Sequence, residues 1–159
     1  MLFRSAARLS GFGLGRIDVN TGSDARVGAD LTLADGGRFS LVATNTRIDA
    51  GVTARSGDIW VSNVYNDAIG NLVAAKGSIV LGAGGALDVR GKWSNALVTP
   101  GDATGLAYVD GGSVTLRATQ DVTLAKGSRI DASSGAAVAP DGSLRGGRSE
   151  EHTSELQSR

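Results

Sequence analysis

The sequence predicts an all-β fold in which short strands coil into a parallel β-solenoid with coils of about 20 residues. Three observations predict it. A Gly-rich phrase recurs along the chain, apolar and polar residues alternate within each phrase, and residues 6–147 contain no Glu, which is common in surface helices. Abundant Gly, Val, Thr, Asp and Ala favour strands joined by tight turns.

The recurring phrase is Gly-x-apolar-x-apolar. It stands at residues 37–41, 57–61, 77–81 and 112–116, and its first three copies begin 20 residues apart. A repeat of this length is one supersecondary unit, which cannot bury its apolar side alone. We therefore expect successive units to stack as parallel strands, with a corner Gly that adopts a positive φ at the start of each phrase.

Residues 111–135 repeat the pattern most clearly. Apolar anchors fall eight residues apart, first at Val114 and Leu116, then at Val122 and Leu124, then at Ile130. Eight residues suit one strand and one corner. Alternation places these anchors inward and the residues between them outward.

A companion phrase, apolar-Asp-small, occurs at residues 17–19, 48–50, 87–89 and 130–132. Each Asp follows an inward apolar residue and so points outward at a turn. We expect it to accept hydrogen bonds from turn N–H groups. A calcium ladder is the alternative, although the Gly-Gly-x-Gly-x-Asp nonapeptide of calcium-binding solenoids is absent.

The remaining chain is assigned by the same pattern. Residues 10–15 are expected to be a loose Gly-rich segment, residues 64–75 an irregular segment with helical character, and residues 91–110 an insertion loop. Strands are expected at residues 16–19, 30–33, 39–42, 46–48, 59–61, 79–81 and 87–89.

The two ends differ in composition from the rest. All three Glu and the single His lie in the last twelve residues, which hold none of the 24 Gly. The segment RSEEHTSELQS resembles a translated sequencing-library adapter, and one codon choice for residues 148–152 has a reverse complement that encodes residues 1–5. We therefore expect residues 1–5 and 148–159 to be non-native, and residues 6–147 to form the solenoid. Residues 148–159 would then be a disordered or helical tail. The alternative is that they form a natural acidic helical tail.

Charge excludes some partners. Residues 6–147 contain 13 Lys and Arg (16 minus 3) and 13 acidic residues (16 minus 3), so the net charge is zero. With this balance the sequence has no excess of basic residues that would bind nucleic acid or an anionic membrane surface. The sequence has no Cys, which is compatible with export, and no apolar run of signal-peptide or membrane-spanning length. An export signal would therefore lie outside this sequence.

Three segments carry a family resemblance: residues 85–95 (GALDVRGKWSN), 111–116 (GGSVTL) and 129–135 (RIDASSG). Together they resemble the shaft of filamentous-haemagglutinin-type large exoproteins. The resemblance implies a right-handed parallel β-helix, secreted to the surface of a Gram-negative cell by an outer-membrane β-barrel transporter of the two-partner secretion type. The family's Asn-Pro-Asn motifs are absent, because Pro100 follows Thr99 and Pro140 follows Ala139. The transporter is then a partner only through a segment not present here.

The sequence thus predicts a non-catalytic shaft segment of a secreted adhesin, with no cofactor and no metal. Trp93 and Tyr108 on the insertion loop are the candidate surface-binding residues for a host glycan or protein. The alternative is a carbohydrate-binding or carbohydrate-active β-helix, which would bring three or more carboxylates and basic groups together near Trp60 or Trp93. The Gly-rich segments 11–15 and 82–85 do not have phosphate-binding spacing.

Overall fold

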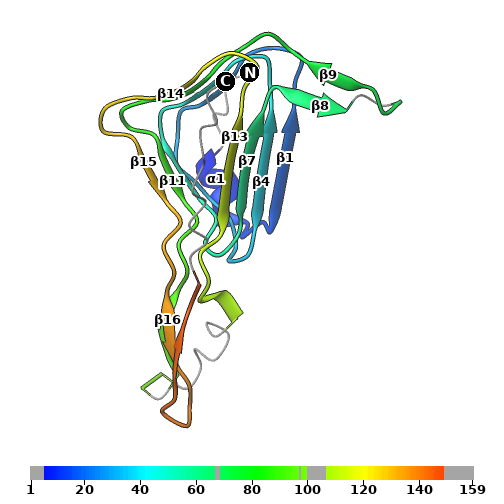
Figure 1. Ribbon diagram of the computed structural model, residues 1–159. Coiled ribbons are helices and arrows are strands. Elements are labelled where there is room, and N and C mark those ends of the chain that lie inside the picture. Colours follow the sequence, from blue (N-terminus) through cyan, green and yellow to red (C-terminus); the bar gives the residue numbers. More distant parts are fainter. Residues whose placement is uncertain (1–5, 67–68, 97, 100–106, 149–159) are drawn as a thin grey trace, which may run out of the picture.

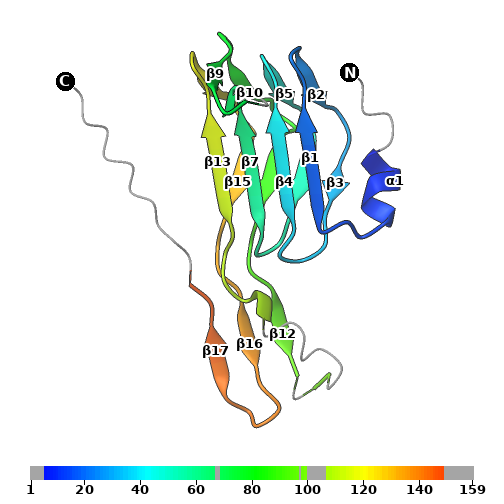
Figure 2. The same cartoon turned by 90° about the vertical axis from the view of Figure 1, so that its right-hand side faces the viewer.

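The computed structural model describes residues 6–66, 69–96, 98–99 and 107–148. Within these residues the chain passes four times, in the same order, through three parallel sheets (Figures 1 and 2). The first pass is β1 (Arg16–Asn20), β2 (Ala25–Val27) and β3 (Leu31–Thr32), and the second is β4 (Arg38–Val42), β5 (Thr46–Ile48) and β6 (Gly51–Thr53). The third is β7 (Asp58–Ser62), β10 (Ile79–Leu81) and β11 (Ala86–Asp88), and the fourth is β13 (Ser113–Arg117), β14 (Val122–Leu124) and β15 (Arg129–Asp131).

Each side of the stack is one sheet of four strands. The first sheet has the order β1-β4-β7-β13, the second β2-β5-β10-β14 and the third β3-β6-β11-β15, and all these pairs are parallel. The all-β prediction is confirmed. The stacked parallel sheets are compatible with a solenoid, and the three anchors of residues 111–135 are the three sides of a single pass.

The length of a pass agrees with the prediction only where nothing is inserted. Register partners in the first sheet are 22 residues apart from Arg16 to Arg38 and 20 apart from Arg38 to Asp58, but 55 apart from Asp58 to Ser113. Two insertions account for the longer third pass. One follows β7 and the other follows β11.

The first insertion corrects two expectations. The described parts of this segment, residues 64–66 and 69–75, are not helical: β8 (Val64–Asn66) and β9 (Leu72–Ala74) form an antiparallel hairpin. The hairpin also displaces the phrase that begins at Gly77 into the second sheet, where Ile79 pairs with Thr46. The 20-residue step from Gly57 to Gly77 is therefore not one pass, and the true counterpart of Gly57 is Gly112.

Inward side chains form stacked apolar columns between the sheets, as the alternation predicted. β-branched and leucine side chains suit such columns, because they are stiff at χ1 or pack well on a pleated surface. Each large side chain that is fully buried contributes about 1.5–3 kcal/mol to folding. The largest fully buried apolar side chains are Leu41, Ile48, Val52, Ile59, Val61, Ile79, Leu81, Leu87 and Val89.

The glycines that begin the phrases are needed for a different reason from the one expected. Their φ angles are not positive; the positive-φ glycines among the described residues are Gly13, Gly36, Gly70, Gly127 and Gly142. Instead, a Cβ on Gly57 would lie 2.0 Å from the carbonyl oxygen of Gly37, and one on Gly112 would lie 1.9 Å from that of Gly57. Each pass therefore crosses the preceding one at a corner too close for any side chain.

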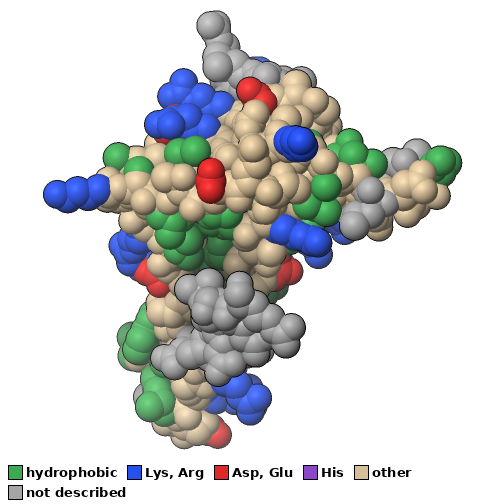
Figure 3. All heavy atoms as spheres, turned by 45° about the horizontal axis from the view of Figure 1, so that its top comes forward, with side chains coloured by type: hydrophobic (Ala, Val, Ile, Leu, Met, Phe, Trp, Pro, Cys, Tyr) green, Lys and Arg blue, Asp and Glu red, His purple; other side chains and the backbone are tan. Residues whose placement is uncertain are grey.

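The two ends of the stack differ. At the first pass, helix α1 (Ala6–Gly11) packs Leu9 against the core, and the backbone N–H of Thr32 donates to Ser10 Oγ at 2.9 Å. The helix replaces part of the loose segment expected at residues 10–15. At the fourth pass, inward side chains remain partly exposed, and Figure 3 shows hydrophobic side chains gathered in the middle of the body. Among the described residues, no helix is long and apolar enough to cross a membrane.

Candidate functional site

The second insertion projects from the body as an extension (Figure 2). Its sheet has the order β12-β16-β17, in which β12 (Trp93–Asn95) is parallel to β16 (Ala136–Val138) and β17 (Leu144–Gly146) is antiparallel to β16. The expected insertion loop, residues 91–110, therefore contributes a strand. Its partners come from beyond the fourth pass, in a segment that the sequence pattern had placed in the shaft. Part of the predicted loop lies outside the described residues.

The extension joins the body through a neck of three glycines, Gly91, Gly135 and Gly147. A Cβ on Gly91 or Gly147 would lie 2.1 or 1.9 Å from the carbonyl oxygen of Val109, and one on Gly135 would lie 1.9 Å from that of Lys92. The N–H of Gly135 donates to the same Val109 oxygen at 2.7 Å. Because the strands meet at van der Waals limits, the neck holds the extension in a defined position.

One face of the extension is an apolar platform. Residues that alternate along a strand share a face, and the register places the two outer residues of each of the three strands together. Trp93 is 78% exposed and Leu144 is 74% exposed, whereas Ser94 and Ala137 on the opposite face are buried. The platform comprises Trp93, Asn95, Ala136, Val138, Leu144 and Gly146. An exposed indole beside small and aliphatic side chains and the amide of Asn95 is a surface on which a sugar ring can stack.

Tyr108, the other predicted binding residue, has different surroundings. It is half-buried, and its ring covers the turn at Gly36, where φ is 70° and a Cβ would lie 2.8 Å from Tyr108 Cε1. Its carbonyl oxygen accepts a hydrogen bond from the N–H of Lys92 and lies 2.6 Å from Ser56 Oγ. Tyr108 therefore anchors the base of the extension, and Trp93 presents its side chain to solvent.

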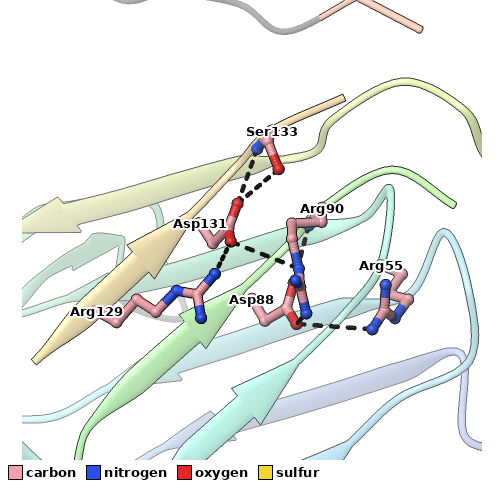
Figure 4. Close-up of polar contacts among 6 residues, drawn as sticks. All are labelled: Arg55, Asp88, Arg90, Arg129, Asp131 and Ser133. Carbon is pink, nitrogen blue, oxygen red and sulfur yellow. Dashed lines mark hydrogen bonds and ion pairs between the residues drawn. The ribbon is translucent and has the colours of Figure 1, made fainter. Parts of the chain in front are cut away.

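Outward charged residues on the third sheet form an ion-pair ladder, Arg55, Asp88, Arg90, Arg129 and Asp131 (Figure 4). Asp88 and Asp131 are register partners in β11 and β15. Arg90 lies between them, with Nη2 at 2.7 Å from Asp88 Oδ2 and Nε at 3.6 Å from Asp131 Oδ2. Arg55 approaches Asp88 at 3.9 Å, and Arg129 pairs with Asp131.

The ladder was not anticipated, because Asp and Arg look scattered in the sequence. Asp88 and Asp131 are 43 residues apart, and only the parallel register brings their side chains together. The predicted turn role of Asp is confirmed at both positions: the N–H of Arg90 donates to Asp88 Oδ1 at 3.1 Å, and the N–H of Ser133 donates to Asp131 Oδ1 at 3.2 Å. Asp49 instead binds the side chains of Arg26 and Arg47.

Electrostatics keep both carboxyl groups of the ladder ionised. Partial burial raises the pKa of Asp88, but hydrogen bonds from Arg90 and the charges of Arg90 and Arg55 lower it further, so the pKa lies below its usual value. Burial also raises the pKa of Asp131, and bonds from Ser133 and Arg129 outweigh it in the same way. A carboxyl group that acts as a general acid has a raised pKa, whereas the pKa values of Asp88 and Asp131 are both lowered.

Metal binding needs several converging ligand atoms. In the part of the chain that the structure describes, no group of three or more His, Cys, Asp or Glu side chains could hold a metal ion. The charged side chains of the ladder instead pair with one another. The apolar platform is thus the feature of this structure most suited to contact another molecule.

Comparisons with protein-family models, curated proteins and solved structures gave no match to this chain, so the geometry described above carries the functional argument.

Proposed function

We propose that this chain is a shaft segment of a secreted filamentous-haemagglutinin-like exoprotein, folded as a right-handed parallel β-helix and without catalytic activity. The observation that carries the proposal is the unbroken register of three parallel sheets over four passes. Stacked backbone ladders and apolar columns make a rod in which each pass stabilises the next. Such a rod would hold the binding elements that it carries at a distance from the cell surface.

The extension is the element that this rod displays. Its glycine neck fixes its position, and its apolar platform exposes Trp93. The chemistry of an indole among small side chains favours a carbohydrate of a host or cell surface, since the apolar face of a sugar ring stacks on an aromatic side chain. Specificity would come from polar groups around the indole.

The proposed route of secretion rests on the resemblance in residues 85–95, 111–116 and 129–135. An outer-membrane β-barrel transporter of the two-partner secretion type would export the protein through a segment that this sequence does not include. The zero net charge supports the absence of nucleic acid among its partners.

A carbohydrate-active β-helix is the second candidate, favoured by the five charged side chains gathered in the ion-pair ladder. Against it, both carboxyl groups are held ionised by arginines, so that neither is suited to donate a proton. Incubation of the protein with acidic and neutral polysaccharides, followed by reducing-end and 235-nm absorbance assays, separates the two. Product formation that Asp88→Asn abolishes would favour the enzyme.

The binding role is tested on a glycan array with the fluorescently labelled chain. We expect Trp93→Ala to lose at least about 1 kcal/mol of binding free energy, a fivefold or larger loss of affinity. Phe12→Ala is the matched control, because Phe12 is also exposed, at 73%, but lies beside α1 at the opposite end of the stack. Equal binding by the wild type and Trp93→Ala would refute the platform as the binding surface.

A further inference from the structure

The outer face of the first sheet carries an aromatic residue near its centre. In β7, Ile59 and Val61 are buried in the core, so Trp60 between them points outward. β7 has β4 on one side and β13 on the other. Figure 2 looks onto this face, with the strands β1, β4, β7 and β13 in front of the rest of the stack. Passes of the chain on both sides therefore form the surroundings of Trp60.

Short polar side chains flank the indole across the sheet. Trp60 is the register partner of Ser40 in β4 and of Thr115 in β13. A serine and a threonine are too small to cover the ring between them, and Trp60 is partly exposed. Their hydroxyl groups, and the carboxylate of Asp58 two residues earlier in β7, can bond to the hydroxyl groups of a sugar whose ring stacks on the indole.

Two arginines lie diagonally on opposite sides of Trp60. Arg38 precedes the level of Trp60 by two residues in β4, and Arg117 follows it by two residues in β13. Strand geometry places the Cα atom of each roughly 8 Å from that of Trp60. Both are exposed, and neither takes part in an ion pair within the part of the chain that the structure describes. The nearby carboxylate of Asp58 instead accepts a hydrogen bond from Ser113 Oγ at 2.5 Å.

The outward charges of this sheet do not cancel. They are three arginines and two aspartates, Arg16, Arg38, Arg117, Asp18 and Asp58, so one positive charge is in excess. Arg16 pairs with Asp18 in β1, which leaves the two arginines beside Trp60 for an external anion. A guanidinium group matches the geometry of a carboxylate, to which it donates two parallel hydrogen bonds.

The two aspartates of this face are not placed as a catalytic pair. Asp18 and Asp58 lie two passes apart, with roughly 12 Å between their Cα atoms from strand geometry. Their side chains point to different partners, Asp18 to Arg16 and Asp58 to Ser113. Glycosidases hold their two carboxyl groups closer together, so this face is suited to binding and not to hydrolysis.

We propose that this face binds a linear acidic oligosaccharide. One ring stacks on Trp60, and the carboxylate groups of neighbouring uronic acid residues reach Arg38 and Arg117. The diagonal between the two arginines spans roughly 16 Å, which suits a chain of several sugars and not a single one. The site lies on the body, apart from the apolar platform at Trp93, and does not depend on the glycan role proposed for that platform.

Tryptophan fluorescence provides the first test, because the chain has two Trp and each marks one site. In Trp93→Phe the sole indole is Trp60, and we expect a saturable change in its emission when a purified oligogalacturonate is added. In Trp60→Phe the sole indole is Trp93, and the same titration is expected to leave its emission unchanged. A response from Trp93, or none from Trp60, would overturn the proposal and leave the test of the platform on the glycan array unaffected.

Calorimetric titration of the full chain with the same oligogalacturonate is the second test. We expect Arg38→Gln and Arg117→Gln each to weaken binding at least about fivefold, because each removes a charge-assisted contact. Lys126→Gln is the matched control: it removes the same charge from an exposed position between β14 and β15, away from the first sheet, and should change the affinity less than about twofold.

A neutral cello-oligosaccharide of equal length gives the matching control for the ligand. We expect it to bind at least about tenfold more weakly, because it has no carboxylate for either arginine. Circular dichroism melting shows that the variants are folded, which is expected for substitutions at exposed positions. Equal effects of the three charge substitutions, or equal affinity for the acidic and the neutral chain, would contradict the proposal.

Discussion

Asn63 and Thr119 are 56 residues apart in the chain and are joined by two hydrogen bonds. The N–H of Thr119 donates to Asn63 Oδ1 at 3.0 Å, and Asn63 Nδ2 donates to Thr119 Oγ1 at 3.2 Å. Asn63 is 1% exposed, and its Nδ2 also donates to the carbonyl of Gly77 at 2.7 Å. One buried amide thus fastens both ends of the β8–β9 hairpin to the fourth pass.

The first prediction follows from this arrangement. Asn63→Ala removes the donor of the buried hydrogen bond to the Gly77 carbonyl and the acceptor of the Thr119 N–H. An unsatisfied buried polar group costs about 1–3 kcal/mol. We expect the free energy of unfolding, measured by urea denaturation, to fall by about 2 kcal/mol. Asn66→Ala in β8, at an exposed position, is expected to change it by less than about 0.5 kcal/mol. An equal effect of the two variants would mean that the buried amide does not hold the hairpin.

The second prediction concerns the corner glycines. Gly57→Ala places a Cβ 2.0 Å from the carbonyl oxygen of Gly37, which forces two passes apart. We expect a loss of about 3 kcal/mol or more in the free energy of unfolding. Gly22→Ala is the control, because a Cβ there meets nothing within 4 Å. Thermal melts of both variants check this, and a Gly57→Ala protein as stable as wild type would show that the corner can relax.

The third prediction concerns a buried hydroxyl. Thr46 is 2% exposed, and its Oγ1 has no hydrogen-bond partner in the structure. Thr46→Val replaces that hydroxyl with a methyl group in the column between Ala25 and Ile79. We expect the free energy of unfolding to rise by about 1 kcal/mol, because the desolvation cost disappears. Thr123→Val, at an exposed position, should not reproduce the gain in a urea titration.

The fourth prediction concerns acid stability. The folded-state pKa values of Asp88 and Asp131 are lowered, so their contribution is fully present above the ordinary Asp pKa of about 3.9 and is lost as pH falls through the lower folded values. We expect urea midpoints of the wild type to fall steeply below about pH 4. Arg90→Gln moves the pKa of Asp88 toward its ordinary value and should reduce that slope, whereas Lys126→Gln should leave it unchanged. Parallel slopes for all three proteins would count against the ladder.

Much of the strand pattern could be predicted from the sequence because it depends on local chemistry. The expected strands at residues 46–48 and 79–81 coincide with β5 and β10, since alternation alone determines which side chains can face a core. The helical character expected for residues 64–75 was wrong because the prediction depends on alternation alone. A hairpin of only two three-residue strands gives too few alternations to identify.

The candidate site was predicted in part. Trp93 was identified as an exposed aromatic residue of an insertion, and the structure exposes it on the apolar platform. The partners that build that platform, β16 and β17, lie some 40–50 residues further along the chain. No local pattern around residue 93 indicates them.

The sequence by itself determined the strand class, the inward apolar columns and the eight-residue sides of one pass, because these follow from period-two geometry and turn chemistry. Only the tertiary structure decided which phrases are register partners, that Gly57 matches Gly112 across two insertions, and that Asp88 meets Asp131. The physical reason is that parallel register is a long-range property. Parallel register is set by the backbone hydrogen bonds and the close corner contacts between whole passes. Inserted segments change which residues are register partners, but the repeating phrase itself does not show where they occur.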